Sequence, residues 1–262
     1  MNYSELRDEI KRCADSDFKG TSDAMQKIIF SQNIGDVCEL LVDIGFIPED
    51  IVHDSSEEKL YTKVSEILFA KALDFMNMDV RVISERADSA DIIAKSKFHG
   101  YSLAGDAKAF RLSRTAKNAK DFKVDSMDAW RGDCEFAVLV CPYFQYPVSK
   151  SQIYKEALNR NVMLMSWEWL YIMLKEGVRE TENTSLKDIW NQSAIISNHT
   201  TVPQQKDCFI EEQDGNMGAI LVITEERKNE LFSRIKNKIA LRADKEIMYY
   251  EGEKDRIAHM SK

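Results

Sequence analysis

Two short apolar runs with a helical segment between them constrain the fold of this chain most strongly. The runs are EFAVLVCPYF at 135–144 and VMLMSW at 162–167, and SKSQIYKEALNR at 149–160 separates them. Both are almost continuously apolar, which is typical of strands covered on both faces, whereas a half-exposed strand alternates. The strand–helix–strand order favours some parallel pairing. The runs therefore predict an α/β core with buried central strands.

Further predicted elements precede and follow this unit. The strongest helix is SSEEKLYTKVSEILFAKALDFMNM at 55–78, because its apolar residues form one stripe and two serines can cap it. Short strands are predicted at 80–83, 91–94 and 101–110, and a helix follows the second apolar run. Residues 4–46 are helical in pieces, 224–262 are helix-prone, and 197–207 are predicted to be a loop. The expected fold is a mixed central sheet flanked by helices, with extra helical segments at both ends.

The composition is that of an ordinary soluble globular protein. The chain has 262 residues, 44% of them apolar, and a net charge of −8. Its five cysteines include no C-x-x-C pair, which favours free thiols in a reducing compartment over disulfides or zinc. No signal peptide is visible, and the longest apolar run is far too short to cross a bilayer. We therefore expect a cytoplasmic protein that does not interact with membranes.

One basic segment stands out in this acidic chain. GDAKAFRLSRTAKNAKDFK at 105–123 carries a cation at every third position: Lys108, Arg111, Arg114, Lys117, Lys120 and Lys123. This spacing belongs to neither a strand nor a straight α-helix, so we expect the chain to leave the strand soon after Phe110 and to form a loop or short turn. Salt screens distant charges, so a local cluster can still bind phosphate. Without a neighbouring acid pair, a solvated basic turn would be the simpler interpretation.

An acid pair does lie beside this segment. Asp91 opens one predicted strand, and Asp106 and Lys108 occupy alternate positions of the next, so their side chains share a face. If the two strands pair like a hairpin, Asp91 approaches Asp106, and two close carboxylates favour a bound cation such as Mg²⁺. A lysine beside that metal suits phosphodiester hydrolysis. The pattern matches the PD-(D/E)-x-K nuclease signature, with Ala90 where proline is expected; by itself it is weak, because a solvated strand edge can carry the same residues.

Longer stretches carry a more specific resemblance. Three of them together resemble type II restriction endonucleases of the HindIII family, over about residues 35–195: GDAKAFRLSRTAKNAKDFKV at 105–124, FQYPVSKSQIYKEAL at 144–158 and EEKLYTKVSEILFAKALDFMNM at 57–78. The resemblance implies a restriction-endonuclease-like core and a Mg²⁺-dependent homodimer, with Mn²⁺ able to substitute. It further implies cleavage of double-stranded DNA after the first A of the palindrome AAGCTT, leaving 5′ overhangs.

The resemblance also implies roles for individual residues. Asp91 and Asp106 would bind the metal, with the carbonyl of Ala107 as a third ligand, and Lys108 would be the catalytic lysine. The DNA-binding candidates are Arg111, Arg114, Lys117, Asn118, Lys120, Asp121 and Lys123. Asn118 suits a bidentate contact with adenine. An acid is expected at position 84, where this chain has Ser84 followed by Glu85.

Several questions stay open at the level of sequence. A helix glutamate often joins such a site, and Glu58, Glu66 and Glu85 are all candidates. Gln145 or Tyr146, after the first apolar run, could reach DNA, whereas the aromatic residues of 167–171 suggest core packing. We expect one domain over 1–262, with a helical extension from about 205 that could be a dimer arm, a DNA-wrapping arm or a packed helix.

Other functions remain as alternatives. A structure-specific repair or junction nuclease would use the same acids, and an inactive relative would bind DNA without cutting it. The chain has no P-loop, which argues against ATP dependence. It also has no methylase motif, so a cognate DNA methyltransferase is expected as a genetic partner encoded separately.

Overall fold

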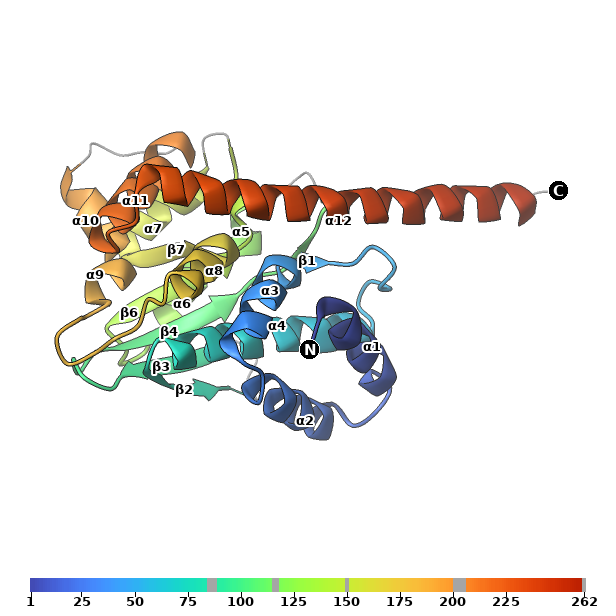
Figure 1. Cartoon of the computed structure of the whole chain (residues 1–262), viewed down its shortest axis with the longest axis horizontal. Coiled ribbons are helices and arrows are strands. Elements are labelled where there is room, and N and C mark those ends of the chain that lie inside the picture. Colours follow the sequence, from blue (N-terminus) through green and yellow to red (C-terminus); the bar gives the residue numbers. More distant parts are fainter. Residues whose placement is uncertain (84–88, 115–117, 149–150, 200–205, 261–262) are drawn as a thin grey trace.

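The computed structural model describes residues 1–83, 89–114, 118–148, 151–199 and 206–260 (Figure 1). The strands are β1 (Phe46–Ile47), β2 (Met78–Val82), β3 (Ile92–Ser96), β4 (Ser102–Ala107), β5 (Phe110–Arg111), β6 (Phe136–Cys141) and β7 (Val162–Ser166). The helices up to β6 are α1 (Tyr3–Cys13), α2 (Phe18–Phe30), α3 (Ile34–Ile44), α4 (Ser56–Phe75), α5 (Ala119–Phe122) and α6 (Val124–Trp130). After β6 come the 3-10 turn η1 (Tyr143–Gln145) and the helices α7 (Gln152–Arg160), α8 (Trp167–Lys175), α9 (Lys187–Trp190), α10 (Gln192–His199), α11 (Lys206–Ile220) and α12 (Glu225–Met260).

A mixed sheet forms the centre of the fold, as the sequence predicted. Its strand order is β2-β3-β4-β6-β7. The β2-β3-β4 part is antiparallel, and β4, β6 and β7 are parallel. A second, two-stranded sheet pairs β1 with β5 in parallel. Strand β4 is therefore the point where the antiparallel half of the main sheet meets the parallel half.

Helices cover both faces of this sheet (Figure 1). Along β6, Val138 and Val140 pack into a core shared with α3, α4 and α8, whereas Ala137 and Leu139 pack into a second core shared with α6 and α7. All of these side chains are buried. This two-sided burial confirms the first apolar run, β6, as a central strand. The second run, β7, is also buried on both faces but lies at the edge of the sheet, so its predicted central position is wrong.

Helix α4 is the strongest predicted helix and lies under the antiparallel half of the sheet. Ser55 caps it by accepting a hydrogen bond from the amide of Glu58. From Leu60 onward most of its residues are buried, so it is surrounded by protein on most of its surface. Its Phe69 lies so close to Gly105 of β4 that a Cβ there would be 2.5 Å from the Phe69 ring. This close approach brings α4 against the strand that carries Asp106.

Helix α12 runs along the body of the molecule and then extends beyond it (Figure 1). Its first half packs on α3 and α8, with Leu231 and Ile235 buried. Farther along, it exposes Leu241 and Met248, which are 65% and 69% accessible. The start of α12 therefore packs on the body of the molecule, and Tyr250 still bonds to Glu49, whereas Ile257 and Met260 near its far end are exposed.

The sequence analysis missed or misplaced some helices. Helices α6, α9 and α10 were not predicted, whereas α11 falls inside the helical extension expected from about 205. The expected loop at 197–207 overlaps the end of α10 and the start of α11. Residues 197–199 stay helical because α10 buries Ile196 in the second core, which outweighs the polar local composition. None of the helices in the described ranges is long and apolar enough to cross a membrane.

Candidate active site

Pairing of β3 with β4 brings the two predicted aspartates together. Ile92 is paired with Gly105, and the amide of Asp91 donates to the Gly105 carbonyl at 2.9 Å. Oδ2 of Asp91 accepts a hydrogen bond from the amide of Ala107 at 2.8 Å. The carboxylate of Asp91 therefore lies across the end of β4, next to Asp106.

Asp106 and Lys108 lie side by side, as the alternation along the strand predicted. Asp106 is 3% exposed, and the ammonium of Lys108 forms an ion pair with its Oδ2. No group in the described ranges offers this oxygen a hydrogen bond of good geometry. The two observations are compatible, because an ion pair requires proximity alone whereas a hydrogen bond also requires direction. Asp106 therefore presents a buried, negatively charged oxygen that lacks a directed donor.

The helix glutamate nearest this pair is Glu66 of α4. It is 9% exposed, and the ammonium of Lys63 donates to it at 2.5 Å and to the carbonyl of Ile83 at 2.6 Å. Burial raises the pKa of Glu66 to about 7; Lys63 opposes this, and the charge of Asp106 adds to it. Glu66 is therefore electrostatically part of the aspartate pair.

The other two glutamate candidates are placed differently. Glu58 accepts hydrogen bonds from Arg111 at 2.7 Å, from the amide of Asp54 at 2.7 Å and from His53 at 3.0 Å. Glu85 and Ser84 lie outside the described residues. The tertiary structure thus favours Glu66, which the sequence could not separate from Glu58.

Electrostatics make this cluster a suitable cation site. Burial raises the pKa of Asp91 well above its ordinary value, and the charges of Asp106 and Glu66 raise it further. The amide of Ala107 and the ammonium of Lys108 oppose these effects. Buried carboxylates that repel one another, one with an oxygen lacking a directed donor, fit a divalent cation, which would offset their mutual repulsion.

A tighter group of potential ligands lies elsewhere. Within the described ranges, His53, Asp54 and Glu58 have ligand atoms all within 4.8 Å of one another. His53 and Asp54 are exposed, and the charge of Glu58 is already balanced by its ion pair with Arg111. The group is therefore a poorer cation site than the buried cluster around Asp106, although its side chains are closer together.

Arg111 points into the protein. Its guanidinium donates to the carbonyls of Pro48 and Ile51, at 2.7 and 2.8 Å, and to the carboxylate of Glu58. These bonds tie β5 to the loop before α4. The cation that was predicted to contact DNA is therefore engaged within the fold.

The remaining basic segment is closer to solvent. Arg114 pairs with Asp121 at 2.7 Å, and Asp121 accepts from the amide of Asn118 at 2.8 Å to begin α5. Lys120 and Lys123 are exposed, and the ammonium of Lys123 lies 5.2 Å from the centre of the Trp130 ring. Lys117 lies outside the described residues. As predicted, the chain leaves the strand direction just after Phe110.

A groove of about 560 Å³ lies between α4 and the basic segment. Its lining includes Thr62, Ala109, Arg111 and Arg114. Thr62 is one helical turn before Glu66, and Ala109 directly follows Lys108. The groove is therefore lined by residues that are close in sequence to Glu66 and Lys108, and by Arg114 of the basic segment.

Two residues that contact the site were not predicted as site residues. Lys63 bonds to Glu66 at a helical spacing of three, which is a usable sequence signal. Trp167, predicted to pack in the core, donates to the carbonyl of Lys108 at 2.9 Å, which no local pattern indicates. Gln145 and Tyr146, either of which could reach DNA according to the sequence, are both buried in this structure.

Comparisons with known proteins bear on the whole chain. The sequence profile of the HindIII restriction endonuclease family matches residues 7–262. The chain is 38% identical over 242 residues to the type II restriction enzyme HindIII of Haemophilus influenzae, which covers 92% of this chain and 81% of that protein. A solved structure of the restriction endonuclease FokI aligns with a TM-score of 0.38 and 13% identity, over 68% of this chain and 34% of FokI. That structural similarity is too low to carry an argument.

The sequence relationship defines the class as a type II restriction endonuclease, a site-specific DNA endonuclease. The chain belongs to the HindIII restriction endonuclease family. The match extends beyond residues 35–195, where the sequence analysis had limited it. Membership supports a site-specific DNA endonuclease over a junction nuclease, and it implies a divalent metal in general.

Proposed function

We propose that Asp91 and Asp106, with the carbonyl of Ala107, bind Mg²⁺, and that Lys108 is the catalytic lysine of DNA cleavage. The observation that best supports this is the buried Oδ2 of Asp106, which lacks a directed donor beside the Lys108 ammonium. Mg²⁺ prefers hard oxygen ligands and retains waters. Mn²⁺ accepts the same ligand type and is expected to substitute.

The chemistry divides between the metal and the protein. A divalent cation held by Asp91, Asp106 and the carbonyl of Ala107 would supply Lewis-acid activation of the phosphate and of water. The ammonium of Lys108 holds the attacking water and stabilises the negative charge that develops on the phosphate oxygens. Glu66, held by Lys63, serves as the additional carboxylate of the site. Together these groups perform phosphodiester hydrolysis.

The basic segment is proposed to bind DNA. Arg114, Lys117, Lys120 and Lys123 are proposed to contact phosphates or guanine edges, and Asn118 to contact adenine. Asp121 holds this surface by pairing with Arg114 and bonding to the amide of Asn118. Arg111, which also lines the groove, is proposed to hold the groove wall in place, because its donors are engaged by backbone carbonyls and Glu58.

The proposed target is AAGCTT in double-stranded DNA, cut after the first A to leave 5′ overhangs. The similarity to the type II enzyme HindIII supports this sequence. A palindrome cut in both strands by one protein requires twofold symmetry, so the enzyme is proposed to act as a homodimer.

The remaining proposals concern organisation and context. Residues 1–262 are proposed to form one restriction-endonuclease domain, with about 205–262 as its helical extension. A DNA methyltransferase is proposed as the genetic partner that protects host DNA. The cytoplasm is the proposed compartment, supported by the free thiols of Cys13, Cys38 and Cys134.

Digestion of a mapped plasmid tests the proposal. With Mg²⁺, the purified protein should cut only at AAGCTT, and sequencing of the ends should show cleavage after the first A. Chelation of the metal should stop the reaction, and Asp106→Asn should reduce it at least a thousandfold, whereas exposed Asp15→Asn should not. Cuts at other sequences would reject the proposed target, and full activity of Asp106→Asn would reject the proposed site.

A further inference from the structure

The backbone of Lys108 is held from two directions. Lys108 follows the last residue of β4, so it is outside the regular ladder of that strand. Its amide donates to the carbonyl of Val140 at 2.7 Å, and its carbonyl accepts from the indole Nε1 of Trp167 at 2.9 Å. The orientation of this backbone determines where the Lys108 side chain starts, and therefore whether its ammonium reaches Asp106.

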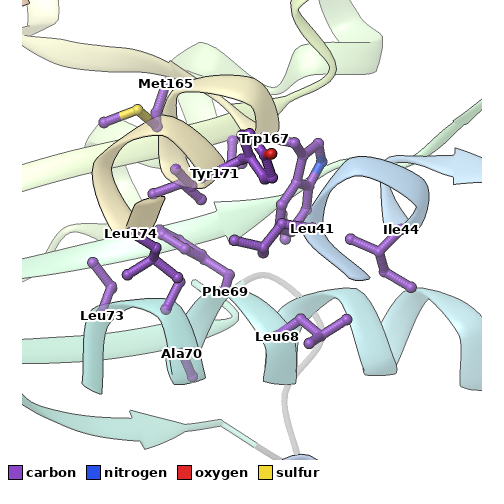
Figure 2. Close-up of a cluster of buried hydrophobic side chains, with 14 of the residues drawn as sticks. Leu41, Ile44, Leu68, Phe69, Ala70, Leu73, Met165, Trp167, Tyr171 and Leu174 are labelled. Carbon is purple, nitrogen blue, oxygen red and sulfur yellow. The ribbon is translucent and has the colours of Figure 1, made fainter. Parts of the chain in front are cut away.

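The Trp167 ring is itself tightly enclosed. Trp167 is 1% exposed and begins α8 directly after β7. At Gly45, which follows α3, a Cβ would be only 2.6 Å from Cδ1 of the indole. The Phe69 ring meets the indole edge-on, with centroids 6.4 Å apart (Figure 2). A ring with so little freedom gives its N–H a fixed direction.

The same cluster holds the strand on the other side of Asp106. Phe69 lies against Gly105, the residue before Asp106, and Trp167 bonds to Lys108, two residues after Asp106. The carbonyl of Gly45 accepts from the amide of Phe110 at 2.9 Å. The core shown in Figure 2 therefore contacts the catalytic strand on both sides of Asp106.

We propose that Trp167 is a positioning residue that orients the backbone of Lys108 through its indole N–H and so keeps the Lys108 ammonium beside Asp106. This proposal rests on the proposed catalytic role of Lys108. Loss of the N–H would leave a largely enclosed carbonyl without its donor, and the backbone there would rotate to find another partner. A small displacement of a catalytic group has a large effect on rate, whereas DNA binding draws on many other contacts.

The competing interpretation is that Trp167 only packs the core. The chain offers a matched control, because the indole of Trp190 is also fully buried and donates to the hydroxyl of Tyr101 at 3.0 Å. Trp190→Phe removes the same N–H and the same ring area from the core, with no contact to Lys108 or Asp106 described. The difference between the two variants isolates the effect on the site.

The experiment compares Trp167→Phe, Trp190→Phe and the native enzyme. The measurements are the single-turnover cleavage rate with Mg²⁺, the Kd for an AAGCTT duplex with Ca²⁺ in place of Mg²⁺, and the melting temperature. We expect Trp167→Phe to cleave about tenfold more slowly with an unchanged Kd, since one buried hydrogen bond corresponds to roughly that factor. Trp190→Phe should lose stability but retain its cleavage rate.

A second replacement separates the hydrogen bond from packing. 3-Benzothienylalanine at position 167 keeps the shape of the indole and has sulfur in place of the N–H, so it also decides the matter if Trp167→Phe does not fold. A native cleavage rate with this replacement, or equal slowing in Trp190→Phe, would overturn the proposal. If Lys108→Ala leaves cleavage intact, the proposed function fails instead, which distinguishes the two failures.

Discussion

Burial and mutual repulsion make the ionised forms of Asp91 and Glu66 unfavourable in the folded chain. In the folded chain the pKa of Asp91 is raised well above its ordinary value and that of Glu66 is raised to about 7. A raised carboxyl pKa means that the folded state holds more protons than the unfolded state between the two pKa values. Stability of the metal-free protein therefore falls as pH rises through that window, from about 4 upward. Below it, both states are protonated and the penalty disappears.

Asp91→Asn tests this at the residue scale. The amide cannot ionise, so we expect the metal-free variant to melt about 2–4 °C above the native protein at pH 8, an increase that corresponds to about 1 kcal/mol. Near pH 4 the difference should vanish, and cleavage should be lost at every pH. Exposed Asp15→Asn is the control. Equal melting temperatures of the variant and the native protein at pH 8 would show that ionised Asp91 does not destabilise the folded chain.

Lys63→Met tests the partner of Glu66. Without the Lys63 ammonium, which opposes the pKa rise, the pKa of Glu66 should rise further above 7. The pH at half-maximal cleavage should then move up by roughly one unit, since nearby charges shift pKa values by about that much. Lys71→Met provides a comparison, because Lys71 is a buried lysine of the same helix that pairs with Asp74. An unchanged pH profile would place Glu66 outside the reaction.

At the scale of elements, the junction of α4 with β4 and β5 builds the site. Gly105 lets Phe69 of α4 approach β4, and Arg111 of β5 bonds to the loop that leads into α4. The loop is also joined to α12, because Glu49 accepts from the amide of Ser113 and from the hydroxyl of Tyr250. These contacts connect α4, β4, β5, α12 and the loop before α4, so they fix the wall of the groove.

Gly105→Ala tests the close approach. The new Cβ would be 2.5 Å from the Phe69 ring and 2.8 Å from Cγ1 of Ile92, so one of these side chains must move. We expect a loss of about 1–3 kcal/mol in unfolding free energy, typical of overpacking. Phe69→Leu in the same chain should recover part of it. Gly215→Ala, where no atom lies within 4 Å, is the control, and equal losses at both glycines would contradict the explanation.

Arg111 and Lys120 form a contrasting pair. Arg111→Met should cost about 1–3 kcal/mol of stability, because two backbone carbonyls and Glu58 lose their donor. The salt dependence of DNA binding should stay unchanged. Exposed Lys120→Ala should leave stability unchanged and reduce the slope of log K against log salt by about 1. The reverse assignment of the two effects would mean that Arg111 is the DNA contact.

The whole molecule joins a two-sided α/β core to a long terminal helix. The start of α12 is packed, and its far end exposes Ile257 and Met260, which are 59% and 74% accessible. Since symmetric cleavage of a palindrome needs two copies, we expect a solution mass twice the 30.2 kDa of one chain. Light scattering at several concentrations measures this. A single-chain mass both alone and with the AAGCTT duplex would contradict the proposed homodimer.

Local patterns in the sequence determined the elements and the pairing of the main acids. Continuous apolar runs predicted buried strands, serine capping and the apolar stripe predicted α4, and alternation placed Asp106 with Lys108. These succeed because strand and helix periods act within a few residues. The enzyme class came from the family resemblance of longer stretches, because helix and strand periodicity carries no information about function.

The tertiary structure alone decided which side chains meet at the site. It selected Glu66 over Glu58, turned Arg111 inward and brought Trp167 to Lys108, across 59 residues of sequence. These contacts depend on how whole helices and strands pack against one another. A local sequence pattern does not indicate which way a side chain points relative to a distant strand. The pKa values of Asp91 and Glu66 are raised mainly by burial. Burial depends on the packed core and cannot be read from the order of residues in the sequence.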